Sequence, residues 1–409
     1  MTDTSVATTA TAPDYPMPRA SCCPFDPPPA LRTLGQEGRI TKVRLWDGTT
    51  SWLVTRYDDQ RALLADPRIS ADTTHPHYPH QSAGAKARRT AARTFINMDD
   101  PEHARLRRMV TAPFMIKRVQ ALRPAIQKIV DGLIDDMLDG PKPVDLVRAF
   151  ALPVPSLVIC ELLGVPYADH DFFQRTSRSL VNRDTPPEEA LVAQQQLVDY
   201  LDDLVGQKLA PPGDNLLSQL AEKRVTAGEL SRHDAAVMGQ LLLVAGHETT
   251  ANMIALGTLA LLEHPDQQAL LRDTDDPKLI TGAVEELLRY LNIVQLGRRR
   301  VALAAIEIGG QTIHAGDGVI MPNDLGNRDP AAFPDPDRLD LRRDARHHVA
   351  FGYGVHQCLG QPLARVELQV VYGTLYRRIP TLRLAIDLDR VPFKHDGAVY
   401  GVYELPVTW

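Results

Sequence analysis

The segment that most constrains the fold runs from Ser231 to about His264 and has the pattern of a single long apolar helix. Ser231 stands at the N-cap position and Asp234 follows three residues later, which is the spacing of a capping box. A helix of this length spans roughly 50 Å, at about 1.5 Å per residue. It must therefore cross the whole molecule, and the other elements have to pack around it.

The middle of this helix carries polar groups where burial favours apolar ones. Glu248 and Thr249 place an acid and a hydroxyl side by side. A zinc protease helix has similar residue types, but it needs a second histidine where this chain has Ala251. The Thr249 hydroxyl can also bond back to the Ala245 carbonyl and bend the helix. A bend at Gly246 and Thr249 would open space for a diatomic ligand and a water molecule.

A second unusual stretch is the glycine-rich loop Phe351–Gly360, in which Cys358 stands just before an apolar helical pattern. Backbone N–H groups and the helix dipole favour a thiolate at such a position. Gly352 and Gly360 allow close approaches that a Cβ would block. The layout suits a large flat ligand with its metal on the sulfur, and haem bound through a thiolate is the first candidate.

The residues alone leave two other roles open for Cys358. Many single cysteines are buried small hydrophobic residues. A nucleophilic cysteine needs a general base, and His356 is only two residues away in sequence. The loop is not a nucleotide cradle, because Gln357 stands where the third glycine of that motif would be.

The pattern Phe-Gly-x-Gly-x-His-x-Cys-x-Gly at 351–360 resembles the haem-ligand signature of the cytochrome P450 family. Four separate motifs follow the order and spacing of that family, including Ala-Gly-His-Glu-Thr-Thr in the long helix and Glu-x-x-Arg at Glu286 and Arg289. The resemblance covers roughly residues 25–409. Within the family, the chain is similar to soluble actinobacterial members, especially family 105, which hydroxylate secondary metabolites and drug-like compounds.

The resemblance implies a mainly α fold with small β-sheets (α+β), the cytochrome P450 fold, in which the long helix lies across the haem. It implies one domain over residues 21–409, after a tail at 1–20 that we expect to be disordered. The cofactor would be haem b, iron protoporphyrin IX, with Cys358 as the iron ligand. Glu286 and Arg289 would form a buried structural pair.

The resemblance also assigns roles to individual residues. Glu248 and Thr249 match the family's catalytic acid and alcohol. His103 and Arg107 lie four apart, so they share a helix face, and they match a pair that binds a haem propionate. The other expected haem contacts are Ala245, Gly246, Arg300, Phe351, Gly352, His356 and Gly360.

Before the long helix, Val43–Tyr57 has the pattern of a β-hairpin and Asp58–Ala65 that of a short helix. Thr73–Arg93 is predicted to be a polar loop over the substrate pocket. Amphipathic helices are expected at about 115–138, 145–163, 168–182 and 187–208, and the last two would form a lid.

Composition narrows the function further. The 409 residues carry a net charge of −6, which gives no sign of nucleic-acid binding. No run of about eighteen uninterrupted apolar residues indicates a membrane span. The cysteines are Cys22, Cys23, Cys160 and Cys358. They match neither a disulfide framework nor a zinc or iron–sulfur set, so we expect a cytoplasmic protein.

The predicted function is a haem-thiolate monooxygenase that inserts one oxygen atom of O2 into a C–H bond of a hydrophobic small molecule. Electrons would come from NAD(P)H through a ferredoxin reductase and a ferredoxin, and we expect a monomer. Candidates for a basic docking patch are Arg105, Arg108, Arg342, Arg343 and Arg346. The alternatives are a non-enzymatic haem sensor or carrier, and a ring-coupling or peroxide-using enzyme of the same fold.

Overall fold

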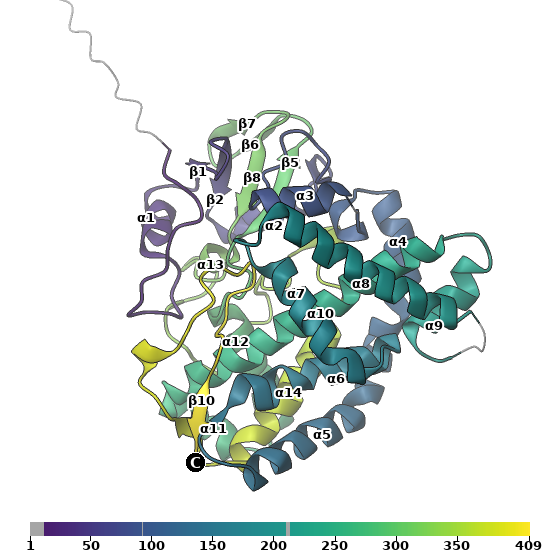
Figure 1. Ribbon diagram of the computed structural model, residues 1–409. Helices are drawn as coiled ribbons and strands as arrows, with labels where there is room; N and C mark the ends of the chain where they lie inside the picture. The colour runs from purple at the N-terminus through teal and green to yellow at the C-terminus, as the bar shows by residue number, and fades with distance from the viewer. Residues whose placement is uncertain (1–11, 92, 210–212) are drawn as a thin grey trace, which may run out of the picture.

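The computed structural model describes residues 12–91, 93–209 and 213–409. The described chain is mainly helical, and most of the strands lie together at the top of Figure 1. The helices are α1 (Pro29–Glu37), α2 (Tyr57–Ala65), α3 (Ala83–Ala91), α4 (Glu102–Thr111), α5 (Ile116–Asp139), α6 (Pro153–Leu163), α7 (His170–Val181), α8 (Pro187–Gln207), α9 (Leu216–Leu220), α10 (Arg232–Leu262), α11 (Pro265–Arg272), α12 (Pro277–Tyr290), α13 (Asn323–Gly326) and α14 (Gln361–Arg378). The strands are β1 (Ile40–Arg44), β2 (Thr50–Val54), β3 (Ile69–Ser70), β4 (Val144–Asp145), β5 (Arg298–Ala302), β6 (Ile306–Ile308), β7 (Gln311–Ile313), β8 (Gly318–Met321), β9 (Arg383–Leu384) and β10 (Pro406–Thr408).

Helix α10 is the predicted long helix, and it runs through the middle of the helical part (Figure 1). The capping box is present: the Ser231 hydroxyl accepts from the Asp234 N–H at 3.0 Å, and the Asp234 carboxylate accepts from the Ser231 N–H at 3.2 Å. Helices α6, α8 and α14 pack against α10 and bury most of its circumference. This burial explains why the helix is apolar on all sides.

The largest sheet has the strand order β1-β2-β8-β5-β3, with β2 and β8 parallel and the other neighbours antiparallel. The β1–β2 pair is the predicted hairpin. Strand β5 positions the functional site, because alternate residues of a strand share a face. Arg298 and Arg300 therefore lie on one face and Arg299 on the other. The remaining strands form a β4-β10-β9 sheet and the β6–β7 hairpin.

The stretch Thr73–Arg93, predicted to be a loop, contains helix α3. The prediction was wrong here because the prolines and histidines lie before Ala83, whereas the rest of the stretch is rich in Ala, Lys and Arg, which favour helix. Helix α3 also packs against α8, one of the predicted lid helices. That contact supplies the tertiary support that so short a helix needs.

The predicted helix at 145–163 is divided into a short strand, a π-helical turn and α6. The turn spans Val147–Ala151, and the N–H of Leu152 closes it on the carbonyl of Val147 at 2.9 Å. Helix α6 then begins at Pro153, which fits a first helical position but has no N–H to continue the preceding turn. The helices predicted at about 115–138, 168–182 and 187–208 are α5, α7 and α8.

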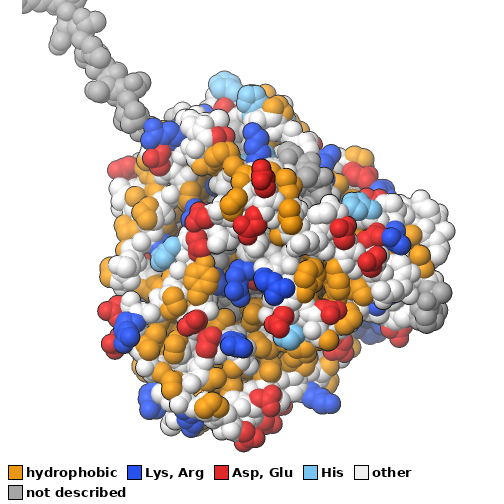
Figure 2. All heavy atoms as spheres, in the orientation of Figure 1, with side chains coloured by type: hydrophobic (Ala, Val, Ile, Leu, Met, Phe, Trp, Pro, Cys, Tyr) orange, Lys and Arg blue, Asp and Glu red, His pale blue; other side chains and the backbone are white. Residues whose placement is uncertain are grey.

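Residues 1–11 of the predicted tail lie outside the described residues. Within residues 12–20 the chain is packed: Tyr15 is 4% exposed, and its N–H donates to the Arg44 carbonyl at 2.8 Å. The packed chain thus begins before the predicted boundary at residue 21. Over the described ranges, every helix is too short or too polar to cross a bilayer. On the face drawn in Figure 2, acidic, basic and apolar side chains are interspersed.

Candidate active site

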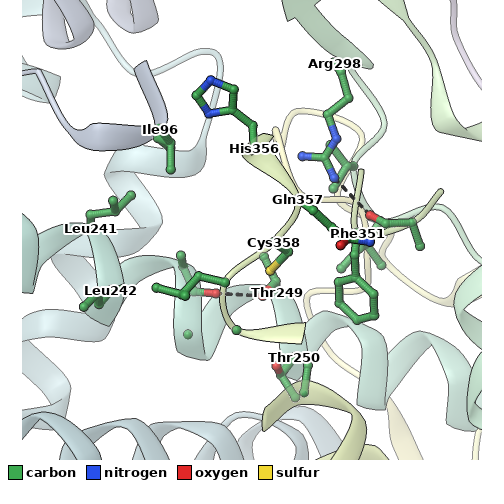
Figure 3. Close-up of a pocket in the computed structure, with 18 of the residues that line it drawn as sticks. Ile96, Leu241, Leu242, Thr249, Thr250, Arg298, Phe351, His356, Gln357 and Cys358 are labelled. Carbon is green, nitrogen blue, oxygen red and sulfur yellow. Dashed lines mark hydrogen bonds between the residues drawn. The ribbon is translucent and has the colours of Figure 1, made fainter. Parts of the chain in front are cut away.

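A cavity of about 360 Å³ lies between the middle of α10, strand β5 and the loop that carries Cys358 (Figure 3). This volume falls within the range of small-molecule sites. Apolar side chains form much of the wall, and cationic groups gather at one part of it. The apolar part includes Phe95, Ile96, Ile159, Leu241, Leu242 and Ile293.

The loop before α14 presents Cys358 to the cavity. Gly352 and Gly354 have positive φ angles of 74° and 73°, which favour glycine. A Cβ on Gly354 would lie 2.4 Å from the Leu64 carbonyl oxygen, so glycine is required at that position. The Cys358 N–H donates to the Phe351 carbonyl at 2.9 Å, which turns the sulfur into the cavity. Figure 3 shows this sulfur facing the space between α10 and β5.

The surroundings of the Cys358 thiol act on its pKa in opposite directions. Burial raises its pKa, and this effect exceeds the opposing influence of Arg298 and of the Gly360 N–H at the start of α14. The helix N-terminus alone therefore does not produce a thiolate. A metal ion is the group that deprotonates a coordinating thiol outright.

Five arginines line the cavity, Arg89 and Arg299 among them. The other three are Arg107, Arg298 and Arg300. They donate to the carbonyl oxygens of Gln357, Ala350 and Arg299, at 2.6, 3.0 and 2.7 Å respectively. No carboxylate among the described residues pairs with any of them. Uncompensated charges in a cavity are costly, so this wall is suited to an anionic ligand.

Two histidines adjoin this wall. His103 is 2% exposed, and its Nδ1 lies 2.9 Å from Asp100 Oδ1. The rings of His103 and His356 stand 4.1 Å apart. His103 Nε2 and His356 Nδ1 are both buried without a hydrogen-bond partner. Burial, aided by Arg300, lowers the pKa of His356 to about 3, so this ring is neutral. These two buried nitrogen atoms can therefore hydrogen-bond a polar ligand.

Several side chains in the middle of α10 hydrogen-bond the backbone of the same helix. The side chains of His247, Thr249 and Asn252 hydrogen-bond the carbonyl oxygens of Leu243, Ala245 and Glu248, each at 2.7 Å. Such bonds to the carbonyl four residues back compete with the helical ladder. A Cβ on Gly246 would lie 2.7 Å from Ile159, so glycine lets α6 approach α10 here.

The structure separates the predicted catalytic pair. Thr249 lines the cavity (Figure 3), and so does Ala245. Glu248 does not line it: this residue is 6% exposed, and its carboxylate lies 3.7 Å from His247 Nε2 and 3.5 Å from Asn252 Nδ2. One residue in a helix turns the side-chain direction by about 100°. Thr249 therefore faces the cavity while Glu248 points away from it.

The sequence matches a known family over its length. The model of the family described as cytochrome P450 matches residues 171–379. "Cytochrome P450 GfsF" of Streptomyces halstedii is 58% identical over 415 aligned residues, and the match covers 100% of both chains. The chain belongs to the cytochrome P450 family. It is a P450 monooxygenase, and the family implies a haem-thiolate cofactor.

Solved structures agree with this assignment. The crystal structure of GfsF superposes on this P450 with a TM-score of 0.92 at 59% identity, covering 97% of this chain and 100% of that one. MoxA from Nonomuraea recticatena, a CYP105 structure, gives 0.89 at 48% identity, covering 97% and 98%. A mycinamicin VIII C21 methyl hydroxylase, MycCI from Micromonospora griseorubida, gives 0.91 at 42% identity, covering 97% and 100%. The predicted fold and the resemblance to family 105 are confirmed.

The nine predicted cofactor contacts other than Cys358 differ in whether they line the cavity of this P450. Those that line the cavity are Arg107, Ala245, Gly246, Arg300, Phe351, His356 and Gly360. Gly352 lies behind the lining and supplies the turn of the loop, and His103 stands behind His356. The structure thus brings together most of the predicted set around one cavity.

Two residues that sequence reasoning missed also line the cavity of this P450. Arg298 does so because it shares a strand face with Arg300. The alternation of side chains along β5 was the sequence signal for this position. Glu367 on α14 is 2% exposed, and its Oε2 has no partner. Burial raises its pKa to about 8, and the nearby Thr250 hydroxyl opposes the shift. The sequence signal that could have revealed Glu367 is an acidic residue within the apolar pattern of Leu363, Val366 and Leu368.

The predicted pair of Glu286 and Arg289 is fully buried, at 0% exposure for both side chains. Arg289 Nε and Nη2 donate to the Glu286 carboxylate at 2.7 and 2.8 Å. Arg343 Nε also donates to Glu286, at 3.2 Å. Arg343 therefore belongs to this internal network, and its placement in a docking patch was wrong.

Proposed function

We propose that this P450 hydroxylates an apolar secondary metabolite by inserting one oxygen atom of O2 into a C–H bond. The observation that carries the proposal is that one cavity holds Cys358, three guanidinium groups without counter-charges and the Thr249 hydroxyl. The sulfur suits an iron ligand, the cations suit the acidic edge of a porphyrin, and the hydroxyl suits proton delivery.

The cofactor in this proposal is haem b, and the chain has groups that fit each part of it. Cys358 would hold the iron. Arg107, Arg300 and His356 would meet the propionates, and His103 would support His356 from behind. Arg298 is a further cation on the same wall. The remaining predicted contacts, Ala245, Gly246, Phe351, Gly352 and Gly360, would border the macrocycle.

A thiolate-bound haem supplies oxygen activation, because the thiolate pushes electron density that favours O–O cleavage. Thr249 would hand protons to the reactants, since its hydroxyl is at the cavity wall. Glu248 would relay protons to Thr249 from the far side of α10, after turning away from Asn252.

The substrate in the proposal is an apolar molecule held by Ile96, Leu241, Leu242 and Ile293. The name of the MycCI structure supports this class, because it describes hydroxylation of a methyl group of mycinamicin VIII.

Electrons would reach the site from a ferredoxin and its reductase, in a cytoplasmic monomer. The docking surface would include Val355, which is 59% exposed and three residues before Cys358. Among the predicted arginines, Arg105 and Arg346 are paired with Glu102 and Asp344. Arg108 and Arg342 are exposed without an ion-pair partner in the described chain, and they are the better candidates for an acidic partner.

The names of the relatives favour an enzyme over a non-enzymatic haem sensor or carrier. A ring-coupling or peroxide-using enzyme of the same fold is the second hypothesis, and Thr249 at the cavity wall favours hydroxylation over it.

A spectral screen tests the proposal. Apolar metabolites are added to the haem-loaded protein, and those that shift the haem spectrum to high spin are retained. Each is then incubated with a surrogate ferredoxin, its reductase, NAD(P)H and isotopically labelled O2. The expected product is heavier by one labelled oxygen atom. A product formed without labelled oxygen, or only with added peroxide, would support the second hypothesis instead.

A further inference from the structure

Three of the four cysteines have no part in the site described above, and two of these are neighbours in sequence. Cys22 and Cys23 are adjacent and exposed, and their sulfur atoms lie 3.2 Å apart. Cys160 is buried, and burial raises its pKa to about 12, so it is chemically inert. Cys358 faces the cavity. The exposed thiols outside the cavity are therefore the neighbouring pair.

A turn in the backbone brings the two sulfur atoms together. Neighbouring residues in an extended strand point to opposite sides. Here the Cys23 N–H donates to the Ala20 carbonyl at 3.2 Å, and the Asp26 N–H donates to the Cys23 carbonyl at 3.1 Å. Pro24 follows and fixes its own φ angle. The bent path places both side chains on one side.

The turn is anchored to the body of the protein on both flanks. Before it, the Arg19 side chain is 3% exposed, pairs with Asp324 at 3.3 Å and lies 4.3 Å from the Tyr400 ring centre. After it, the Tyr400 hydroxyl donates to the Pro24 carbonyl at 3.0 Å. The two thiols are thus held in contact by a fixed segment, which makes a reaction between them effectively unimolecular.

We propose that Cys22 and Cys23 form a redox modification site, which peroxide oxidises to an intramolecular disulfide and thiols reduce again. The Cys22 thiolate attacks hydrogen peroxide, because the hydrogen bond with Cys22 raises the pKa of the Cys23 thiol. This step gives a sulfenic acid and hydroxide. The second thiol displaces the sulfenic oxygen as water, and the S–S bond forms. Two thiols are oxidised and one peroxide becomes two water molecules.

The geometry supports both directions of this reaction. The sulfur atoms have to approach by about 1.2 Å to reach disulfide length. Neighbouring Cα atoms are about 3.8 Å apart, which is shorter than disulfides ordinarily span, so the closed ring is strained. Strained and exposed disulfides are the labile ones, and reduction by small thiols follows.

Mass spectrometry tests the oxidation step. Haem-loaded protein is treated with one equivalent of hydrogen peroxide, alkylated with iodoacetamide and digested with trypsin. Cleavage after Arg19 and Arg32 yields a peptide that holds both cysteines and neither of the other two. We expect this peptide to be two hydrogen atoms lighter and not alkylated. Dithiothreitol before alkylation should restore two alkylated cysteines.

Matched variants test the pairing itself. Cys22→Ser and Cys23→Ser should each lose the intramolecular product, while Cys160→Ser should behave as wild type. Phenylarsine oxide, which bridges two close thiols with loss of water, should bind once to the reduced wild type and not to either single variant. Sulfinic acids in place of the disulfide, disulfide-linked dimers, or arsenic binding that survives Cys22→Ser would each overturn the proposal.

Discussion

Replacing Glu286 by alanine should destabilise this P450 more than breaking an exposed ion pair does. The Glu286 carboxylate accepts two hydrogen bonds from Arg289, one from Arg343 and one from the Asp340 N–H at 3.0 Å. Alanine removes all four. Arg289 keeps carbonyl acceptors on Asn327, Pro336 and Arg338, but it loses its counter-charge at 0% exposure.

Removing one partner of a buried pair costs about 3–5 kcal/mol. The entropy of unfolding of a chain of 409 residues converts this cost into a fall of roughly 4–6 °C in the unfolding midpoint. Glu102 and Arg105 provide a matched control, because they have the same spacing and an N–O distance of 2.6 Å but side chains that are 42–49% exposed. Glu102→Ala should cost about 0–1 kcal/mol, as exposed pairs do.

The assay is thermal unfolding of both variants at one pH and ionic strength, together with the haem content of the purified proteins. Glu286→Ala should unfold several degrees below wild type and retain less haem, while Glu102→Ala should match wild type within about 1 °C. Equal midpoints for the two variants, with full haem content in both, would refute the buried-pair argument.

Three further predictions concern the cavity. Cys358→Ala should abolish the red-shifted Soret band of a thiolate-bound ferrous carbon monoxide complex, and persistence of that band would show that another residue is the ligand. Thr249→Ala should retain haem and electron uptake but divert the consumption of NAD(P)H to hydrogen peroxide. The ratio of hydroxylated product to NAD(P)H consumed measures this effect. If Thr250→Ala lowers the ratio and Thr249→Ala does not, the wrong threonine has been assigned. Burial raises the pKa of Glu367 from 4.5 to about 8. Between these two pH values, the native state therefore keeps a proton that the unfolded state has released. Stability should fall as pH rises through this window, and Glu367→Gln should flatten the dependence of the unfolding midpoint on pH; an unchanged slope would contradict a protonated Glu367.

Local spacing accounts for what could be predicted well. The capping box of Ser231 and Asp234 and the three-residue spacing of Glu286 and Arg289 are properties of one helix. Their geometry follows from helical periodicity, so a sequence is sufficient to place them. Helix α3 was missed because prolines and histidines precede it, and its contact with α8 comes from a segment about a hundred residues later.

The sequence by itself determined the family, the long central helix, the cysteine loop and many of the residue types around the cavity. Only the tertiary structure decided which of these face the cavity. Thr249 and Glu248 are adjacent in a helix that is apolar on all sides, so no local pattern says which one points inward. The packing of α6 and α14 around α10 makes that choice. Likewise, Arg343 and Arg342 are neighbours, yet only the fold buries one against Glu286 and leaves the other exposed, because burial depends on segments that the chain brings together from afar.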